Sequence, residues 1–276
     1  MAVRIARFAG EFAELAAWTG EPEEQLRAEQ DYHEEDREHW LAWDDSLVVG
    51  ALHPWRSPDG RLRLYFGKCR ADAYQPLASA VAGECYTTFS ADDHEVIAAL
   101  TESGFAEHRR ENEYEIPVSR ADMPVPAGIR IVTADETDLE PLMMLDCAIR
   151  ADIPGAEGWQ PDAVWFREET YDSPFFDPRT YRVALDGDYY VGLARIWKRL
   201  PEQQYCPLGC VGVLSGYRRL GLGRALVAQA LAPLADRGEA LVTAEADATN
   251  IASHTLLTGF GGRVTGSTIE LRRTAA

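Results

Sequence analysis

The chain has 276 residues, of which 46% are hydrophobic and 10% aromatic, and its formal net charge is −18. This length and composition fit one large or two ordinary folded domains and exclude an intrinsically disordered chain. The negative charge argues against nucleic acid and anionic membrane as partners and favours cationic small molecules.

The first half predicts a hairpin followed by alternating helices and strands. Two β-rich runs, Ser46–Trp55 and Arg61–Gly67, flank a turn signal that contains Asp59-Gly60. A polar segment with two prolines, Val118–Gly128, then reads as a linker. The elements expected between the hairpin and this linker are a helix at 74–81, a strand at 85–89, a helix at 92–103 and a strand at 113–118.

The second half predicts a similar order. A hairpin is expected around Asp186-Gly187-Asp188, and an apolar strand, a basic turn and a helix follow within Val211–Leu231. The other expected elements are a strand at 129–132, helices at 135–149 and 161–171, a strand at 240–246, a helix from 250 and a final hairpin through 268–272. We interpret the halves as two copies of one α/β unit with a mixed sheet, in domains 1–122 and 127–276. The alternative is a single irregular α+β domain.

Five cysteines form an odd and scattered set, which argues against a disulfide framework. Cys206 and Cys210 have no second Cys or His pair at zinc-ligand spacing, so we expect no metal. No apolar run approaches the ~18 residues of a membrane helix, and charged residues interrupt the N-terminal segment. We therefore expect a cytoplasmic protein without a membrane partner.

The turn Arg218-x-x-Gly221-x-Gly223 is the strongest chemical signal in the chain. It lacks the third glycine of a dinucleotide fingerprint, because Leu226 stands there, and Arg224 replaces the Gly-Lys-Ser/Thr continuation of a P-loop. The turn still offers two glycines without Cβ atoms, the unpaired first amides of a helix and a favourable helix dipole. These features predict a cradle for phosphates, whereas the simpler interpretation is a solvated basic turn.

In this strand–turn–helix context the motif resembles the GNAT superfamily of acyl-CoA-dependent N-acetyltransferases, whose signature is Arg/Gln-x-x-Gly-x-Gly/Ala. The sequences Val211-Gly212-Val213 and Asn250-x-x-Ser253 strengthen the resemblance, which covers roughly 129–273. The first half resembles a degenerate copy of the same unit. Its segment Phe66–Tyr74, where the glycine turn should fall, has no Gly-x-Gly and therefore no phosphate cradle.

The resemblance implies that acetyl-CoA is the cosubstrate. The pantetheine arm would pair with main chain near Val211 and Val213, the pyrophosphate would lie on the amides of the turn, and Asn250 would contact the pantetheine. Asn250 is also a candidate helix N-cap. The residues implied to bind acetyl-CoA are Val211, Gly212, Val213, Arg218, Arg219, Leu220, Gly221, Leu222, Gly223, Arg224, Asn250 and Ser253.

Catalysis needs a neutral amine, a polarised thioester carbonyl and a proton for the departing thiolate. The family often has a Tyr seven residues after the Asn as general acid, but this chain has Leu257 there. Ser253 is our candidate for that role, with His254 as the alternative. No glutamate lies on the strand before the turn, and Glu202 is the candidate base among several nearby polar residues.

The leading hypothesis is direct acetyl transfer to a primary amine of a small cationic molecule, such as an aminoglycoside or a polyamine. One alternative is acetylation of a cysteinyl sugar by a mycothiol-synthase-like enzyme, whose family also joins two such halves. Another is a sensor that binds CoA without turnover. The oligomeric state, monomer or homodimer, stays open.

Overall fold

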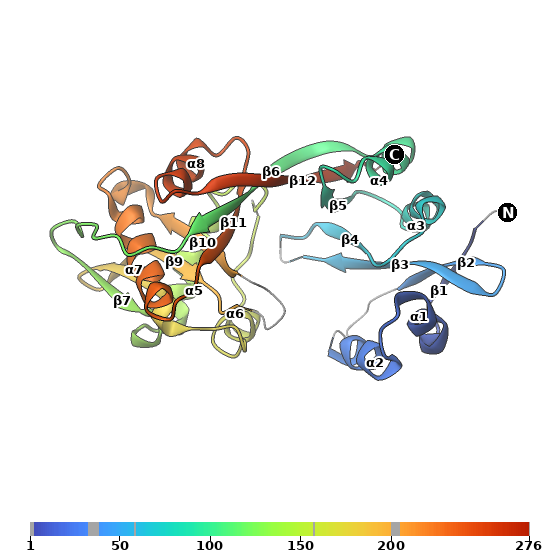
Figure 1. Cartoon of the computed structure of the whole chain (residues 1–276), viewed down its shortest axis with the longest axis horizontal. Helices are drawn as coiled ribbons and strands as arrows, with labels where there is room; N and C mark the ends of the chain where they lie inside the picture. The colour runs from blue at the N-terminus through green and yellow to red at the C-terminus, as the bar shows by residue number, and fades with distance from the viewer. Residues whose placement is uncertain (1–2, 33–38, 58, 157, 200–204, 276) are drawn as a thin grey trace. The chain divides into compact units, whose positions relative to one another are not determined.

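The computed structural model describes residues 3–32, 39–57, 59–156, 158–199 and 205–275 (Figure 1). It divides into two compact units, Met1–Arg110 with Thr268–Ala276, and Glu111–Ser267. The first unit is formed by two separate segments and the second by one continuous segment, because strands pair with residues from the other side of the linker. The domain bounds 1–122 and 127–276 stay a prediction.

The first unit holds a sheet in the order β1-β2-β3-β4-β5-β12. Its pairs are antiparallel except for β4 with β5, which run parallel. Of β12, residues 268–273 pair with β5. The elements are β1 (Arg4–Arg7), α1 (Phe12–Thr19), α2 (Glu23–Tyr32), β2 (Trp40–Asp44), β3 (Leu47–Arg56), β4 (Leu62–Phe66), α3 (Tyr74–Ala80), β5 (Cys85–Ser90), α4 (His94–Glu102) and β12 (Arg263–Arg273).

The second unit repeats this plan in the order β6-β11-β10-β9-β8-β7, again with a parallel pair, β10 with β11, beside an antiparallel neighbour. Of β6, residues 111–117 pair with β11. The elements are β6 (Ala106–Pro117), β7 (Ile129–Thr133), α5 (Leu139–Arg150), α6 (Ala163–Thr170), β8 (Tyr181–Asp186), β9 (Tyr189–Ile196), β10 (Cys206–Val213), α7 (Leu222–Asp236), β11 (Leu241–Asp247) and α8 (Ile251–Thr258).

The expected mixed sheet, the hairpin β8–β9 and the strand–turn–helix from β10 to α7 are confirmed. The hairpin expected through 268–272 is wrong, because Arg263–Arg273 is one continuous strand. Thr268–Arg273 pairs with β5, far away in sequence, rather than with a neighbouring segment. Sequence-local turn signals cannot reveal a pairing of this kind.

Two apolar cores cover the sheet of the second unit. One core joins α7 and α8 to β6, β10 and β11, and includes Leu226, Leu257 and Val242. The other core joins α5 and α6 to β8 and β9, with Ile149 and Leu193 among its members. Side chains that alternate along a strand point to opposite faces, so β10 and its neighbours supply both cores. The sheet thus has a helix layer on each face.

The last strand of the chain is anchored in the first unit by both apolar and charged contacts. Ile269 and Leu271 are buried among α3, α4 and β3–β4. Between them Glu270, 3% exposed, accepts from Arg63 at 2.9 Å and from Arg109 at 3.5 Å. A buried carboxylate is stable only when cations and hydrogen bonds compensate it, as they do here.

We expect Glu270→Gln to destabilise the first unit, because it leaves the guanidinium groups of Arg63 and Arg109 without their shared carboxylate. Breaking a largely buried pair on one side should cost about 2 kcal/mol or more. Chemical denaturation monitored by hydrogen exchange in β12 measures this. The matched control is Glu84→Gln, because Glu84 makes an exposed ion pair with Arg272 on the same strand. An equal effect of both changes would contradict the prediction.

Candidate functional site

The parallel strands β10 and β11 separate along their length. They pair at three positions, from Cys206 with Val242 to Leu208 with Ala244, and the pairing ends there. A register shift between Leu208 and Cys210 marks a bulge against β9, and the following residues pair with β9 alone. The edge of β10 that faces β11 therefore carries main-chain groups without a strand partner beyond Leu208, and an extended ligand can pair with them.

Two glycines allow β10 to take this path. A Cβ on Gly212 would lie 2.2 Å from Cγ2 of Ile149, so α5 packs directly against the backbone of the strand. A Cβ on Gly209, at the bulge, would lie 2.4 Å from Nε1 of Trp197. A larger side chain at either position would have to displace α5 or the indole ring.

The turn between β10 and α7 has the backbone that the glycine motif predicts. Gly221 is the N-cap of α7 with φ of 85°, a conformation that favours glycine, and it provides no side-chain cap. Arg219 also has a positive φ, of 65°. A Cβ on Gly223 would make only ordinary contacts. The first amides of the 15-residue helix α7 thus face an exposed turn, which suits an anionic group.

The three arginines of the motif differ in their surroundings. Arg218 donates from Nε to the carbonyl oxygen of Val213 at 2.9 Å and forms an ion pair with Asp152. It therefore ties the turn back to the end of β10. Arg219 and Arg224 are exposed beside the N-terminus of α7. The guanidinium groups of these two residues are the ones available to a ligand on the turn.

Asn250 and Ser253 lie at the start of α8. The Asn250 side chain accepts from the amide of Ser253 at 3.0 Å, so Asn250 is the N-cap, one of the two roles weighed from sequence. Its side-chain NH₂ group remains as a donor. Leu257, which stands where a tyrosine could have supplied a proton, is 2% exposed and belongs to the core.

Sequence reasoning missed one residue in this region, Tyr114 of β6. Its hydroxyl lies 2.9 Å from Nδ1 of His254 on α8. Tyr114 is also the partner of Ala244 in the β6–β11 ladder, beside the position where β10 and β11 part. No local motif marks Tyr114, because the pairing of β6 with β11 brings it to α8 from 140 residues away.

On the opposite face, β10 borders a buried polar cluster. Asp146 and Arg150 of α5 approach Tyr181 of β8 and Arg195 of β9. Burial raises the pKa of the neighbouring Cys210 thiol to about 11, so this thiol stays protonated at neutral pH. It is therefore a poor nucleophile.

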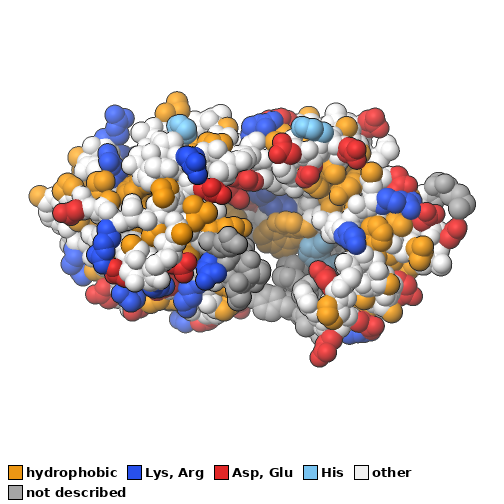
Figure 2. Space-filling model, in the orientation of Figure 1, with side chains coloured by type: hydrophobic (Ala, Val, Ile, Leu, Met, Phe, Trp, Pro, Cys, Tyr) orange, Lys and Arg blue, Asp and Glu red, His pale blue; other side chains and the backbone are white. Residues whose placement is uncertain are grey.

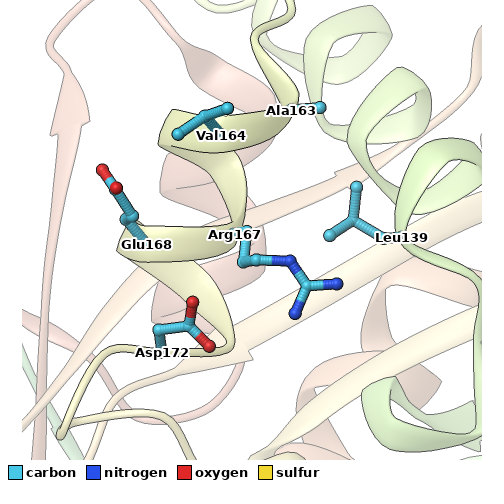
Figure 3. A pocket seen from close by; sticks show the side chains of 6 residues that line it. All are labelled: Leu139, Ala163, Val164, Arg167, Glu168 and Asp172. Atoms are coloured by element: carbon cyan, nitrogen blue, oxygen red, sulfur yellow. The ribbon is translucent and has the colours of Figure 1, made fainter.

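Other expected or possible sites lie elsewhere. Glu202, the candidate base, falls within 200–204, outside the described residues. A shallow pocket of about 320 Å³ lies between α5 and α6, and Figure 3 shows Arg167 extending into it with Leu139 across the hollow. The other residues lining it are Ala163, Val164, Glu168 and Asp172, so it contains none of the candidate site residues.

The corresponding turn of the first unit has a different chemistry. Between β4 and α3 it contains a short 3₁₀ helix, Ala71–Ala73, and no Gly-x-Gly. Its basic residue Arg70 is engaged by Asp72 and Asp44. Carboxylates beside this turn disfavour an anionic ligand, which supports the interpretation of this half as degenerate.

Within the described ranges, no group of three or more His, Cys, Asp or Glu side chains could hold a metal ion. The described helices likewise include none that is long and apolar enough to cross a membrane.

Comparison with known proteins agrees with this geometry. Residues 148–261 match the model of the acetyltransferase (GNAT) family, and this segment is a GNAT acetyltransferase domain. The resemblance inferred from Arg218, Gly221 and Gly223 is therefore confirmed. No curated protein matches the chain at a significant level.

Solved structures resemble the whole chain. A GCN5-related N-acetyltransferase from Sphaerobacter thermophilus has a TM-score of 0.70 at 15% identity, with 100% of this chain and 97% of that chain covered. A tandem GNAT protein from the clavulanic acid biosynthesis pathway has a TM-score of 0.67 at 15% identity, with 99% of both chains covered. At these identities the likeness shows the fold, and that fold is the tandem GNAT arrangement.

The anion-binding role expected for the turn can be tested with Gly223→Asp. The variant should fold normally, because a Cβ at this position has room, but its carboxylate would repel a diphosphate from the amides of α7. We expect acetyl-CoA affinity, measured by calorimetry, to fall at least 30-fold. Gly216→Asp, which adds the same charge at an uncrowded position of the same turn, should change affinity less than threefold. Unchanged binding by Gly223→Asp would contradict the role of this turn.

Proposed function

We propose that the protein transfers an acetyl group from acetyl-CoA directly to a primary amine of a small molecule. The observation that carries this proposal is the separation of β10 from β11 beside the uncapped N-terminus of α7. The pantetheine arm would pair with main chain at Val211 and Val213, and the pyrophosphate would lie on the amides of the turn. Asn250, through its NH₂ group, would donate to the pantetheine.

The reaction forms a C–N bond and breaks a C–S bond. A neutral amine attacks the thioester carbonyl carbon, and the oxygen gains negative charge. The attacking nitrogen then loses one proton to solvent, and the tetrahedral intermediate collapses to an amide and a thiolate. A main-chain amide near Val211 would stabilise the oxyanion. The ammonium proton must leave before attack, and Glu202 remains our candidate base for that step. Positioning of the two reactants would supply much of the rate.

We further propose that Tyr114 protonates the departing thiolate. Its hydroxyl lies beside α8, and its backbone pairs with Ala244, where the strands part. The phenol would give its proton to sulfur, and His254, exposed on α8, would restore that proton from solvent. Ser253, the candidate from sequence, keeps the alternative role of a contact near the sulfur.

The acceptor is proposed to be cationic, in line with the net charge of −18. Figure 2 shows that acidic and basic side chains are interspersed on the face it displays, so the argument rests on total charge rather than on one acidic patch. An aminoglycoside or a polyamine meets this requirement.

The proposed activity is tested by incubating the protein with acetyl-CoA and a panel of amines while free thiol is measured. We expect thiol release that depends on one class of primary amine, with the acetylated product identified by mass spectrometry. Tight binding of acetyl-CoA without thiol release on any amine would instead indicate a CoA sensor. Failure to bind acetyl-CoA would overturn the proposal as a whole.

Tyr114→Phe should lower kcat about 100-fold and leave the KM for acetyl-CoA unchanged, because it removes a proton donor and keeps the ring. Tyr86→Phe is the matched control, because it removes a phenol that is hydrogen-bonded to Glu84 in the first unit. A Tyr114→Phe variant with normal kcat would exclude this residue as the acid.

A further inference from the structure

A buried polar cluster lies on the α5 side of the β10 bulge and has no part in the steps above. Tyr181, Arg195 and Cys210 are cross-strand neighbours on β8, β9 and β10. Asp146 and Arg150 of α5 cover them. Asp146 is 1% exposed, Tyr181 is fully buried and Arg195 is 6% exposed. This depth is unusual for charged side chains.

The charges of this cluster do not balance. Asp146 forms its close ion pair with Arg150, and its other oxygen lies 3.8 Å from a terminal nitrogen of Arg195. In the part of the chain that the structure describes, the charged side chains that act on the buried Cys210 thiol are Asp146, Arg150 and Arg195. Among the described residues, one carboxylate therefore faces two guanidinium groups, which gives the cluster an excess of one positive charge in a region of low exposure. Such a charge is costly unless a counter-ion arrives.

Hydrogen bonding in the cluster is also incomplete. In the part of the chain that the structure describes, Nε of Arg195, the hydroxyl of Tyr181 and Oδ1 of Asp146 have no hydrogen-bond partner. Buried polar atoms are nearly always bonded, to a ligand or water where no protein group serves. The Arg195 guanidinium is held between two rings, 4.6 Å from the Trp197 centroid and 5.6 Å from that of Tyr181.

We propose that Arg195 binds a carboxylate of the acceptor, so that the acceptor is an amino acid with its acetylated amine close to that carboxylate. The planar guanidinium fork fits a carboxylate, and the added negative charge balances the cluster. Tyr181 donates to the same carboxylate. This inference rests on the proposed acetyl transfer and replaces a purely cationic acceptor with a zwitterionic one.

The position of Arg195 suits this role. A Cβ on Gly209 would lie 3.4 Å from Nε of Arg195, so the guanidinium adjoins the bulge itself. The bulge is also where β10 leaves β11. In the proposed complex, the thioester of acetyl-CoA would lie there. A carboxylate on Arg195 thus holds the neighbouring amine beside the carbonyl that it attacks, an effect of orientation rather than of acid–base chemistry.

The test uses pairs of amines that differ only by a carboxylate, L-lysine with cadaverine and L-leucine with isoamylamine. We expect the wild-type protein to acetylate each amino acid at least 30-fold more efficiently, in kcat/KM, than its partner. Arg195→Gln should remove this preference by lowering kcat/KM for the amino acid alone. Arg195→Lys keeps the positive charge but lacks the planar guanidinium group. This variant should retain part of the preference for the amino acid.

Arg167→Gln on α6 is the matched control and should leave the preference intact. Acetyl-CoA affinity should be the same in wild type and in all three variants. A wild type that accepts cadaverine as well as L-lysine would overturn the inference and leave acetyl transfer standing. So would an Arg195→Gln variant that loses activity equally on both members of a pair, since that result indicates a structural role or a bound water.

A binding measurement keeps the inference testable without turnover. In the presence of CoA, the wild-type protein should bind L-lysine more tightly than cadaverine by calorimetry, and Arg195→Gln should bind both alike. Absence of amino-acid binding by the wild type would overturn the carboxylate site. Amino-acid binding without any thiol release from acetyl-CoA would instead keep the carboxylate site and count against the proposed function.

Discussion

The site depends on the end of pairing between β10 and β11 at Leu208 and Ala244. Main-chain groups in a sheet interior normally have partners, so an unpaired strand edge inside a sheet persists only when packing holds the strands apart. Here α5 packs on the backbone at Gly212, and Trp197 packs on the bulge at Gly209. Both contacts require glycine. The opening between β10 and β11 beyond Leu208 and Ala244 is therefore a consequence of both helix packing and local backbone shape.

The opening gives the two faces of the sheet different chemistry. The α8 face presents Asn250 and the hydrogen-bonded pair Tyr114–His254, while the α5 face presents the charged cluster around Arg195. A donor bound in the plane of the sheet would thus have its leaving thiol beside one set of groups and its acceptor beside the other. In the proposed reaction, such a division would let proton transfer and acceptor recognition vary independently.

The two units share a topology but differ at this one place. Each contains a parallel pair next to an antiparallel strand. Residues from the other side of the linker complete each sheet: Thr268–Arg273 in the first unit and Glu111–Pro117 in the second. The first unit lacks the glycine turn, and its Arg70 is neutralised by neighbouring carboxylates. The same fold thus carries a glycine N-cap and exposed helix amides only where the turn sequence allows them.

The sequence by itself determined the strand–turn–helix around Gly221 and Gly223, because glycine conformations and helix-start signals act within a few residues. The same locality explains why the mixed α/β class and the hairpin β8–β9 could be predicted. Tertiary structure alone decided that the last strand joins the first unit, and that Tyr114 and Arg195 stand at the two faces of the opening. These placements come from pairings between residues far apart in sequence, which leave no periodic or motif signal in either partner.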